Sequence, residues 1–313
     1  DVASLNACPT LDGTIEITGD EIVSLQLPSV QEIDGDINIF NSSSINNINL
    51  NQLSSINGSL SITALTALAS IDFTSLENVE DLELISLPSL SLVTFLKGLQ
   101  TVNDLQLSDT ALQTIQGFNT FDTVNILNIN NNKNISTIDL PLQTVTNTLL
   151  ISFNNDHAEI VLDDLIWASN LTIQDVESIS AQNLTAVNGS LIIAYNIFDT
   201  LALDNLTAVG GSVEIFANDE LTDLSLSDLS TIGGELRLFN NTILESITND
   251  SFASLTKIKG AFNVAGDIAN FTLPKLTLVA GDFSLISTNE DFDCSPFNKL
   301  HSSSSIQGHD YTC

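Results

Sequence analysis

Residues 13–17 read Gly-Thr-Ile-Glu-Ile, residues 35–39 read Gly-Asp-Ile-Asn-Ile, and residues 58–62 read Gly-Ser-Leu-Ser-Ile. These glycines are 22 and 23 residues apart, and each is followed by apolar residues at alternate positions. The same string starts again at Gly189, Gly211, Gly234, Gly260 and Gly281. Alternating pairs such as Leu82 and Leu84 keep the phase where the glycine is absent. The chain is therefore an internal repeat of about thirteen turns.

Each turn carries two further apolar segments. One alternates, as in Leu224-Ser225-Leu226, and the other spaces a leucine three residues before a β-branched residue, as in Leu206 and Val209. Alternation with period two predicts strands that have one buried face. Three short segments per turn predict an all-β fold, a right-handed parallel β-solenoid with coils of about 23 residues. The rival is a leucine-rich-repeat horseshoe, which has a denser leucine pattern and an outer helix.

Asparagine and aspartate recur just after the first strand of the repeat. They can bond the backbone of a corner and tolerate left-handed conformations, so a structural ladder is the favoured interpretation. The positions are Asn41, Asp109, Asn131, Asn154, Asp175, Asn218 and Asn240.

No linker divides the chain, which predicts one solenoid domain over residues 1–293 with an N-terminal cap at its start. Residues 294–313 are expected to form a C-terminal cap, since an open solenoid must cover its apolar ends. Cys294 and Cys313 bracket that segment, and we predict a disulfide between them that contributes about 3 kcal/mol. Zinc is the weaker alternative, because zinc-ligand spacings are absent. Cys8 is expected to pair with an upstream cysteine missing from this sequence.

The charge balance excludes several partners. The 313 residues include 39 acidic and 7 basic side chains, for a net charge of −32, while 43% are hydrophobic. Nucleic acid is excluded because phosphate contacts need a basic patch. No apolar run is long enough to cross a membrane. Methionine is absent even at position 1, so we expect a trimmed piece of a longer precursor.

The sequence also carries ten N-glycosylation sequons, close to what its composition gives by chance. Their placement at turns and strand edges is the stronger signal for a secreted glycoprotein. The acceptor residues are Asn41, Asn57, Asn134, Asn170, Asn183, Asn188, Asn205, Asn240, Asn249 and Asn270. Asn183 and Asn205 occupy equivalent positions in successive coils, so we predict incomplete occupancy of at least one.

The repeat, the opening Cys-Pro-Thr-Leu-Asp-Gly of residues 8–13 and the ending Gly-His-Asp-Tyr-Thr-Cys of residues 308–313 resemble fungal cell-surface glycoproteins. These are GPI-anchored proteins of cell-wall and spore-wall organisation with repeats like receptor L domains. The resemblance implies an extracellular protein of the cell surface or wall, held to the membrane only through a lipid anchor on the precursor. It implies no catalytic residue, cofactor or metal.

The runner-up function is a carbohydrate-active β-helix enzyme, a polysaccharide hydrolase or lyase. Glycoside hydrolysis needs two carboxylates that flank the scissile bond. The candidates are Asp163 and Asp164 near His157, and Glu290 and Asp291 with Asp293. Nothing in the sequence indicates that a carboxyl of either group has a raised pKa. No nucleophile elbow or phosphate loop occurs. We therefore expect a non-enzymatic protein.

Three aromatic residues are candidates for binding. By alternation Phe40, Phe216 and Phe239 point outward, and Phe216 and Phe239 should stack about 5 Å apart in successive coils. Such a row offers apolar contacts to a partner, although packing beneath a corner is an equal alternative. The expected partner is cell-wall polysaccharide, a mannoprotein or another surface protein.

Overall fold

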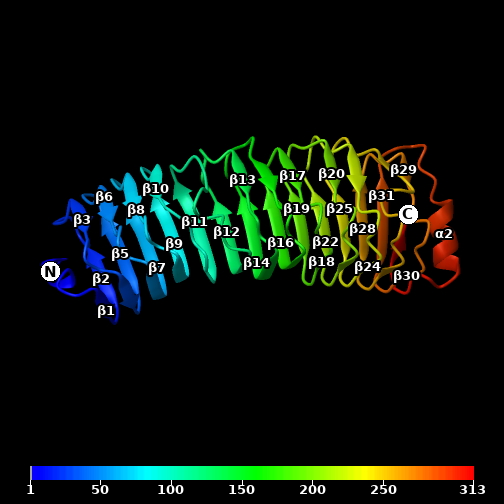
Figure 1. The fold of residues 1–313 in the computed structure, drawn as a ribbon. Coiled ribbons are helices and arrows are strands. Elements are labelled where there is room, and N and C mark those ends of the chain that lie inside the picture. Colours follow the sequence, from blue (N-terminus) through cyan, green and yellow to red (C-terminus); the bar gives the residue numbers. More distant parts are fainter. Residues whose placement is uncertain (1) are drawn as a thin grey trace. The chain divides into compact units, whose positions relative to one another are not determined.

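Short strands pair in parallel at every turn of the chain in the computed structural model, which describes residues 2–313 (Figure 1). The chain forms a parallel β-solenoid of about 13 turns with ~22 residues per turn. Contacts divide it into two units, Asp1–Thr146 with Leu150–Ala158, and Asn147–Leu149 with Glu159–Cys313. The all-β solenoid predicted from the alternating pattern is confirmed, whereas the prediction of one domain stays a prediction.

The first unit begins with a short helix and continues in strands. Its elements are α1 (Val2–Leu5), β1 (Thr10–Asp12), β2 (Ile15–Thr18), β3 (Ser24–Gln26), β4 (Glu32–Asp34), β5 (Ile37–Ser42), β6 (Asn47–Asn49), β7 (Ser55–Leu65), β8 (Ser70–Asp72), β9 (Asn78–Leu87), β10 (Leu92–Thr94), β11 (Asp104–Thr110), β12 (Thr123–Asn130) and β13 (Thr137–Asp139). Strand β14 (Thr144–Ser152) has residues in both units. Strands β2, β5, β7, β9, β11 and β12 follow one another in one parallel sheet, and β3, β6, β8 and β10 form a second.

The second unit repeats the same plan. Its elements are β15 (Glu159–Val161), β16 (Trp167–Gln174), β17 (Ser178–Ser180), β18 (Ala186–Val187), β19 (Leu191–Ala194), β20 (Thr200–Ala202), β21 (Ala208–Val209), β22 (Val213–Phe216), β23 (Asp223–Ser225), β24 (Thr231–Ile232), β25 (Leu236–Phe239), β26 (Ser246–Ile247), β27 (Lys257–Ile258), β28 (Phe262–Gly266), β29 (Asn270–Phe271), β30 (Leu278–Val279), β31 (Phe283–Ser287), α2 (Ser295–Ser302) and β32 (Tyr311–Thr312). Among residues 2–313 no helix is long and apolar enough to cross a bilayer.

The core of each unit is a set of apolar ladders that run from coil to coil. Parallel register places equivalent residues side by side, so each inward position stacks on its own kind. In the first unit the ladder is Ile15, Ile37, Leu60, Leu82, Leu105 and Leu127, and in the second it is Leu191, Val213, Leu236, Phe262 and Phe283. All but Ile15 are buried, and each buried side chain stabilises the fold by roughly 1.5–3 kcal/mol.

The polar residues after the first strand fall into two groups with different structural roles. Asn41, Asp109, Asn131, Asp175 and Asn240 adopt left-handed backbone conformations with φ of 55–60°. These side chains tolerate positive φ better than most residues, which confirms the predicted corner role. Ala64, Ser86, Phe153, Tyr195 and Ala217 adopt similar φ values, so the corner imposes this conformation on other residues too.

Asn154 and Asn218 belong instead to a buried amide ladder one position further along. In the second unit the Oδ1 atom of Asn218 accepts from the Asn196 backbone N–H at 3.1 Å. The Asn218 backbone N–H donates in turn to the Oδ1 of Asn241 at 3.1 Å. The Nδ2 of Asn218 donates to the Ile193 carbonyl at 3.1 Å. Asn132 and Asn154 form the same pattern in the first unit. Each amide satisfies backbone groups that the corner would otherwise bury unpaired.

Helix α2 lies over the last coils of the second unit. Its Phe297 is buried, and the ring lies 5.4 Å from that of Phe283 and 5.9 Å from that of Phe271. Strand β32 then pairs with β31 and brings Tyr311 onto Phe283 at 5.4 Å between ring centres. These aromatic contacts cover the apolar end of the ladder.

Candidate functional site

Three aromatic side chains from successive coils form a row on the outer surface of the second unit. Phe216 ends β22 and Phe239 ends β25, and the two residues are register partners. Their ring centres are 4.8 Å apart with planes inclined by 4°, matching the predicted stacking at about one strand spacing. Tyr195 joins the row from the preceding coil, with its ring 5.5 Å from that of Phe216. We call Tyr195, Phe216 and Phe239 the aromatic row.

The geometry of the row decides which surfaces are open. Phe216 and Phe239 cover one face of each other, so this shared interface is closed to any ligand. Tyr195 approaches Phe216 edge-on at 81° and keeps 53% of its area exposed. It adopts φ of 61° directly after β19, and its corner position lets the side chain point outward. The row therefore presents the Tyr195 ring and hydroxyl beside two half-buried phenylalanine rings.

A small charged cluster flanks this row. One guanidinium nitrogen of Arg237 lies 2.8 Å from a carboxylate oxygen of Glu214, and another lies 3.8 Å from Glu235. The Cζ atom of Arg237 is 5.0 Å from the centre of the Phe239 ring, a cation–π distance. Burial raises the pKa of the Glu235 carboxyl, while Arg237 opposes that rise. Arg237 thus projects from its strand and is engaged by carboxylates.

Phe40, the third predicted aromatic, stands apart from the row. It lies on β5 in the first unit, and its register partners are Thr18 and Thr63 rather than aromatic residues. Its side chain is half-buried. The three residues predicted from alternation therefore separate into one stacked pair and one lone ring, and Tyr195 is the member that sequence reasoning missed.

The sequon asparagines lie at the surface, with one partial exception. Asn41, Asn57, Asn134, Asn183, Asn188, Asn205, Asn240, Asn249 and Asn270 are exposed. Asn170 is half-buried, because its Nδ2 donates to the Asn147 carbonyl at 3.1 Å and its Oδ1 accepts from the Ser190 backbone N–H at 3.1 Å. The predicted crowding at Asn183 and Asn205 stays a prediction, and glycopeptide mass spectrometry that finds both fully modified would contradict it.

The cysteines occupy the ends of the chain. Cys294 and Cys313 form a disulfide that closes the segment holding α2 and β32. Cys8 is exposed and has no disulfide partner among residues 2–313. Its pairing with an upstream cysteine stays a prediction.

Two of the five carboxylates considered for hydrolysis, Asp163 and Asp293, accept hydrogen bonds from neighbouring residues. Asp163 accepts from the Ser180 hydroxyl at 2.5 Å and from the Gln182 backbone N–H at 3.3 Å. Hydrogen bonds from Ser295 lower the pKa of the Asp293 carboxyl, which disfavours proton donation at neutral pH. Within residues 2–313 no group of three or more His, Cys, Asp or Glu side chains is placed to hold a metal ion.

The chain is thus a repeat protein of the parallel β-solenoid class, with exposed sequons and an aromatic row on its outer surface. No protein-family model matches the chain. It is 52% identical over 313 residues to the cell surface GPI-anchored protein ECM33 of Candida albicans, covering 100% of this chain and 75% of that protein.

Two further relatives come from Saccharomyces cerevisiae. The cell wall mannoprotein PST1 is 36% identical over 313 residues, which is 100% of this chain and 69% of the relative. Sporulation-specific protein 2 is 35% identical over 300 residues, which is 96% of this chain and 59% of the relative. The chain belongs to this fungal family of GPI-anchored cell-surface and cell-wall proteins. The names of these relatives state no enzymatic activity.

Proposed function

We propose that this protein organises the fungal cell wall without catalysis, by binding neutral wall polysaccharide at the aromatic row. The observation that carries the proposal is the exposed Tyr195 ring held against the stacked pair of Phe216 and Phe239. A half-exposed aromatic side chain that is fixed by its neighbours loses little entropy on binding. Its hydroxyl adds a hydrogen-bonding group beside an apolar surface.

Charge favours a neutral polysaccharide over an acidic glycoprotein as the partner. The chain has a net charge of −32, so it repels acidic glycoproteins but not an uncharged polymer. The absence of catalysis is supported by two of the candidate carboxylates, because Asp163 and Asp293 are engaged in local hydrogen bonds. Their roles are those of corner and helix-start residues.

The test is depletion of the purified protein by washed insoluble β-glucan, chitin and mannoprotein. Tyr195→Ala combined with Phe216→Ala and Phe239→Ala should weaken depletion by one polymer. The matched control is Phe40→Ala, which removes an outward phenylalanine that has no aromatic neighbour in its register. Selective loss in the triple variant supports the row, whereas equal depletion of the triple variant and wild type contradicts it.

The melting temperature separates binding from packing. If the triple variant keeps its fold but loses depletion, the row is a binding surface. A large fall in melting temperature would indicate that these rings only pack the corner. In that case depletion is measured for Tyr195→Ala alone, because Tyr195 is the most exposed ring of the row. Depletion by mannoprotein alone would identify a glycoprotein partner and overturn the choice of polysaccharide.

A further inference from the structure

One coil of the first unit lacks a strand that its neighbours have. The preceding coils contribute that strand to the sheet formed by β3, β6, β8 and β10. Strands β3, β6, β8 and β10 pair in order, and β10 forms the edge of that sheet. The next strand of this face along the chain is β13, because residues 111–122 contain no strand. The coil between β10 and β13 is therefore irregular, and the sheet is interrupted there.

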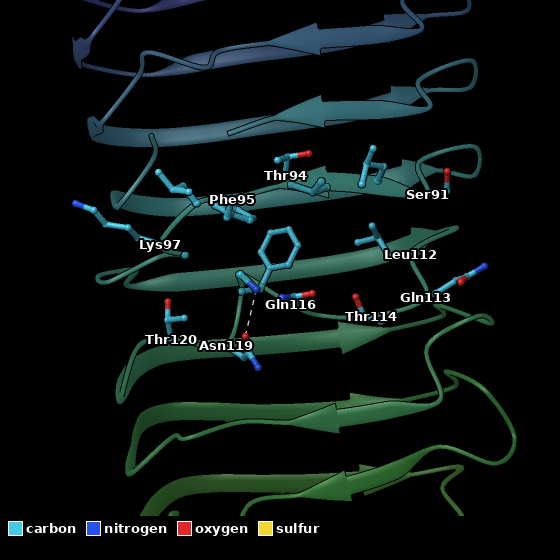
Figure 2. A pocket seen from close by; sticks show the side chains of 16 residues that line it. Ser91, Thr94, Phe95, Lys97, Leu112, Gln113, Thr114, Gln116, Asn119 and Thr120 are labelled. Atoms are coloured by element: carbon cyan, nitrogen blue, oxygen red, sulfur yellow. Dashed lines mark hydrogen bonds between the residues drawn. The ribbon is translucent and has the colours of Figure 1, made fainter. Parts of the chain in front are cut away.

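The interruption leaves an open hollow of about 700 Å³, bounded by residues 91–98 and 112–120 (Figure 2). This volume lies within the usual range of ligand sites. Phe95 and Phe118 lie side by side in the hollow, with ring centres 5.0 Å apart in an edge-to-face contact. Gly117 allows this packing, because a Cβ atom there would lie 2.3 Å from Phe95 Cδ2.

Four of the polar side chains around the hollow are neutral and have no hydrogen-bond partner among the described residues. Thr94, Gln113, Thr114 and Gln116 are exposed, and none forms a side-chain hydrogen bond within residues 2–313. In a chain with 39 acidic residues, the lining of this hollow contains no carboxylate. It therefore combines amide and hydroxyl groups with an aromatic base.

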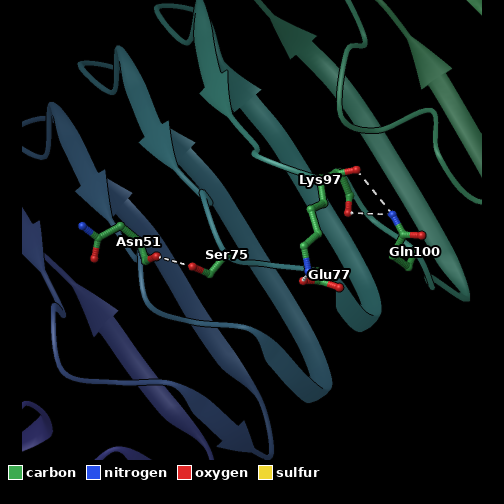
Figure 3. Close-up of polar contacts among 6 residues, drawn as sticks. Asn51, Ser75, Glu77, Lys97 and Gln100 are labelled. Atoms are coloured by element: carbon green, nitrogen blue, oxygen red, sulfur yellow. Dashed lines mark hydrogen bonds and ion pairs between the residues drawn. The ribbon is translucent and has the colours of Figure 1, made fainter.

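Three polar contacts join the loop that forms one wall to Glu77 and Gln100 (Figure 3). The only charged group of the lining, the Lys97 ammonium, is turned away to Glu77, with Nζ 2.6 Å from Oε1. The Gln100 amide donates to the Lys97 and Gly98 carbonyls at 3.4 and 3.3 Å. A wall held by such contacts before binding reduces the entropy that a ligand must remove.

We infer that this hollow binds a neutral oligosaccharide. An anion would meet a strongly acidic molecule whose nearest ammonium is already paired, and a cation would find no carboxylate ligand there. A sugar ring carries both an apolar face, suited to the Phe95 ring, and hydroxyls, suited to Gln113 and Gln116. This site is built separately from the aromatic row and does not depend on the function proposed for that row.

The test titrates the purified protein by calorimetry with hexasaccharides of β-1,3-glucose, β-1,4-N-acetylglucosamine and α-mannose. Gln113→Ala with Gln116→Ala should weaken binding of one of them by about 10- to 30-fold, as expected for two lost neutral hydrogen bonds. The matched control is Gln52→Ala with Gln143→Ala, which removes two exposed glutamines of the same unit outside the hollow.

All four glutamines are exposed, so both double variants should melt like the wild-type protein. Binding that the hollow variant and the control weaken equally would overturn the inference, as would the absence of binding by every hexasaccharide. An extended neutral peptide that binds the hollow when the sugars do not would assign it to strand pairing with β10 instead. The triple variant of the aromatic row should retain the hexasaccharide affinity, which separates failure of one site from failure of the other.

Discussion

Asn218 shows how single residues hold a corner of this solenoid. Its Oδ1 accepts from Asn196 in the preceding coil, its Nδ2 donates to Asn241 in the following coil, and the side chain is fully buried. A buried amide of this kind stabilises only as long as its partners remain paired, because an unpaired buried polar group costs about 1–3 kcal/mol. The ladder is therefore cooperative along the chain.

We predict that Asn218→Ala lowers the free energy of unfolding by roughly 2–5 kcal/mol, since it leaves the Asn196 N–H and the Ile193 carbonyl unpaired. Denaturant unfolding measures the change. The control is Asn46→Ala, an exposed asparagine whose side chain forms no hydrogen bond within residues 2–313. Equal stability of the two variants would show that the ladder contributes nothing.

Asp204 gives a pH-dependent prediction. The Ser225 hydroxyl, and then Ser227, lower the pKa of this carboxyl below its ordinary 3.8. The folded state therefore holds the ionised form more strongly, and the resulting stability is present above pH 3.8 and is lost as the pH falls through the folded pKa.

Asp204→Asn should accordingly lower the melting temperature at neutral pH, with the difference from wild type shrinking as the pH falls below about 4. Asp199→Asn is the control, because the Asp199 carboxylate accepts no hydrogen bond within residues 2–313. A gap that is the same at pH 7 and pH 3 would contradict the assigned cause.

Sequence alone predicts some residues of the site and not others. Alternation places Phe216 and Phe239 on the outer face because they continue strands of period two. Tyr195 follows the strand at a left-handed corner, where that period ends, so its outward direction requires the backbone. The buried Asn218 and the exposed Asn240 are chemically alike, and only their different positions at the corner separate the two roles.

The C-terminal cap closes the end of the second unit through a disulfide and aromatic contacts. The disulfide joins residues 19 positions apart, and Tyr311 stacks on His301 with ring centres 4.2 Å apart. We predict that Cys294→Ser with Cys313→Ser lowers stability by about 3 kcal/mol. Thermal unfolding and hydrogen exchange of β31 and β32 measure this, with Cys8→Ser as control.

An unchanged melting temperature in the double cysteine variant would contradict this account of the cap. The expected loss of stability has two causes. Without the disulfide the unfolded chain has more conformational entropy, and the C-terminal segment can detach and expose Phe283 and Phe297. The Cys8→Ser variant should match the wild type, since Cys8 is exposed and has no disulfide partner among residues 2–313.

The repeat predicts most strands, because register and burial follow the same 22- or 23-residue step. It does not predict the missing strand in residues 111–122. Leu112, Ile115 and Phe118 are buried there, yet they are spaced three apart and so do not alternate as strand residues do. Gly117, with φ of 90°, bends the backbone into the turn against Phe95. That irregularity is where the hollow forms.

At the scale of the whole molecule, charge and sites together support a neutral polymer partner. A net charge of −32 keeps the protein soluble and repels acidic molecules, and salt screens such repulsion. The aromatic row lies in the second unit and the hollow in the first.

We propose that the protein binds wall polymer without cleaving it. The most direct measurement incubates the purified protein with each washed insoluble polymer and assays the same tube for protein left in solution and for reducing ends released. We expect depletion by one neutral polysaccharide with no release of sugar. Release of reducing ends, or protein that stays in solution with every polymer, would contradict it.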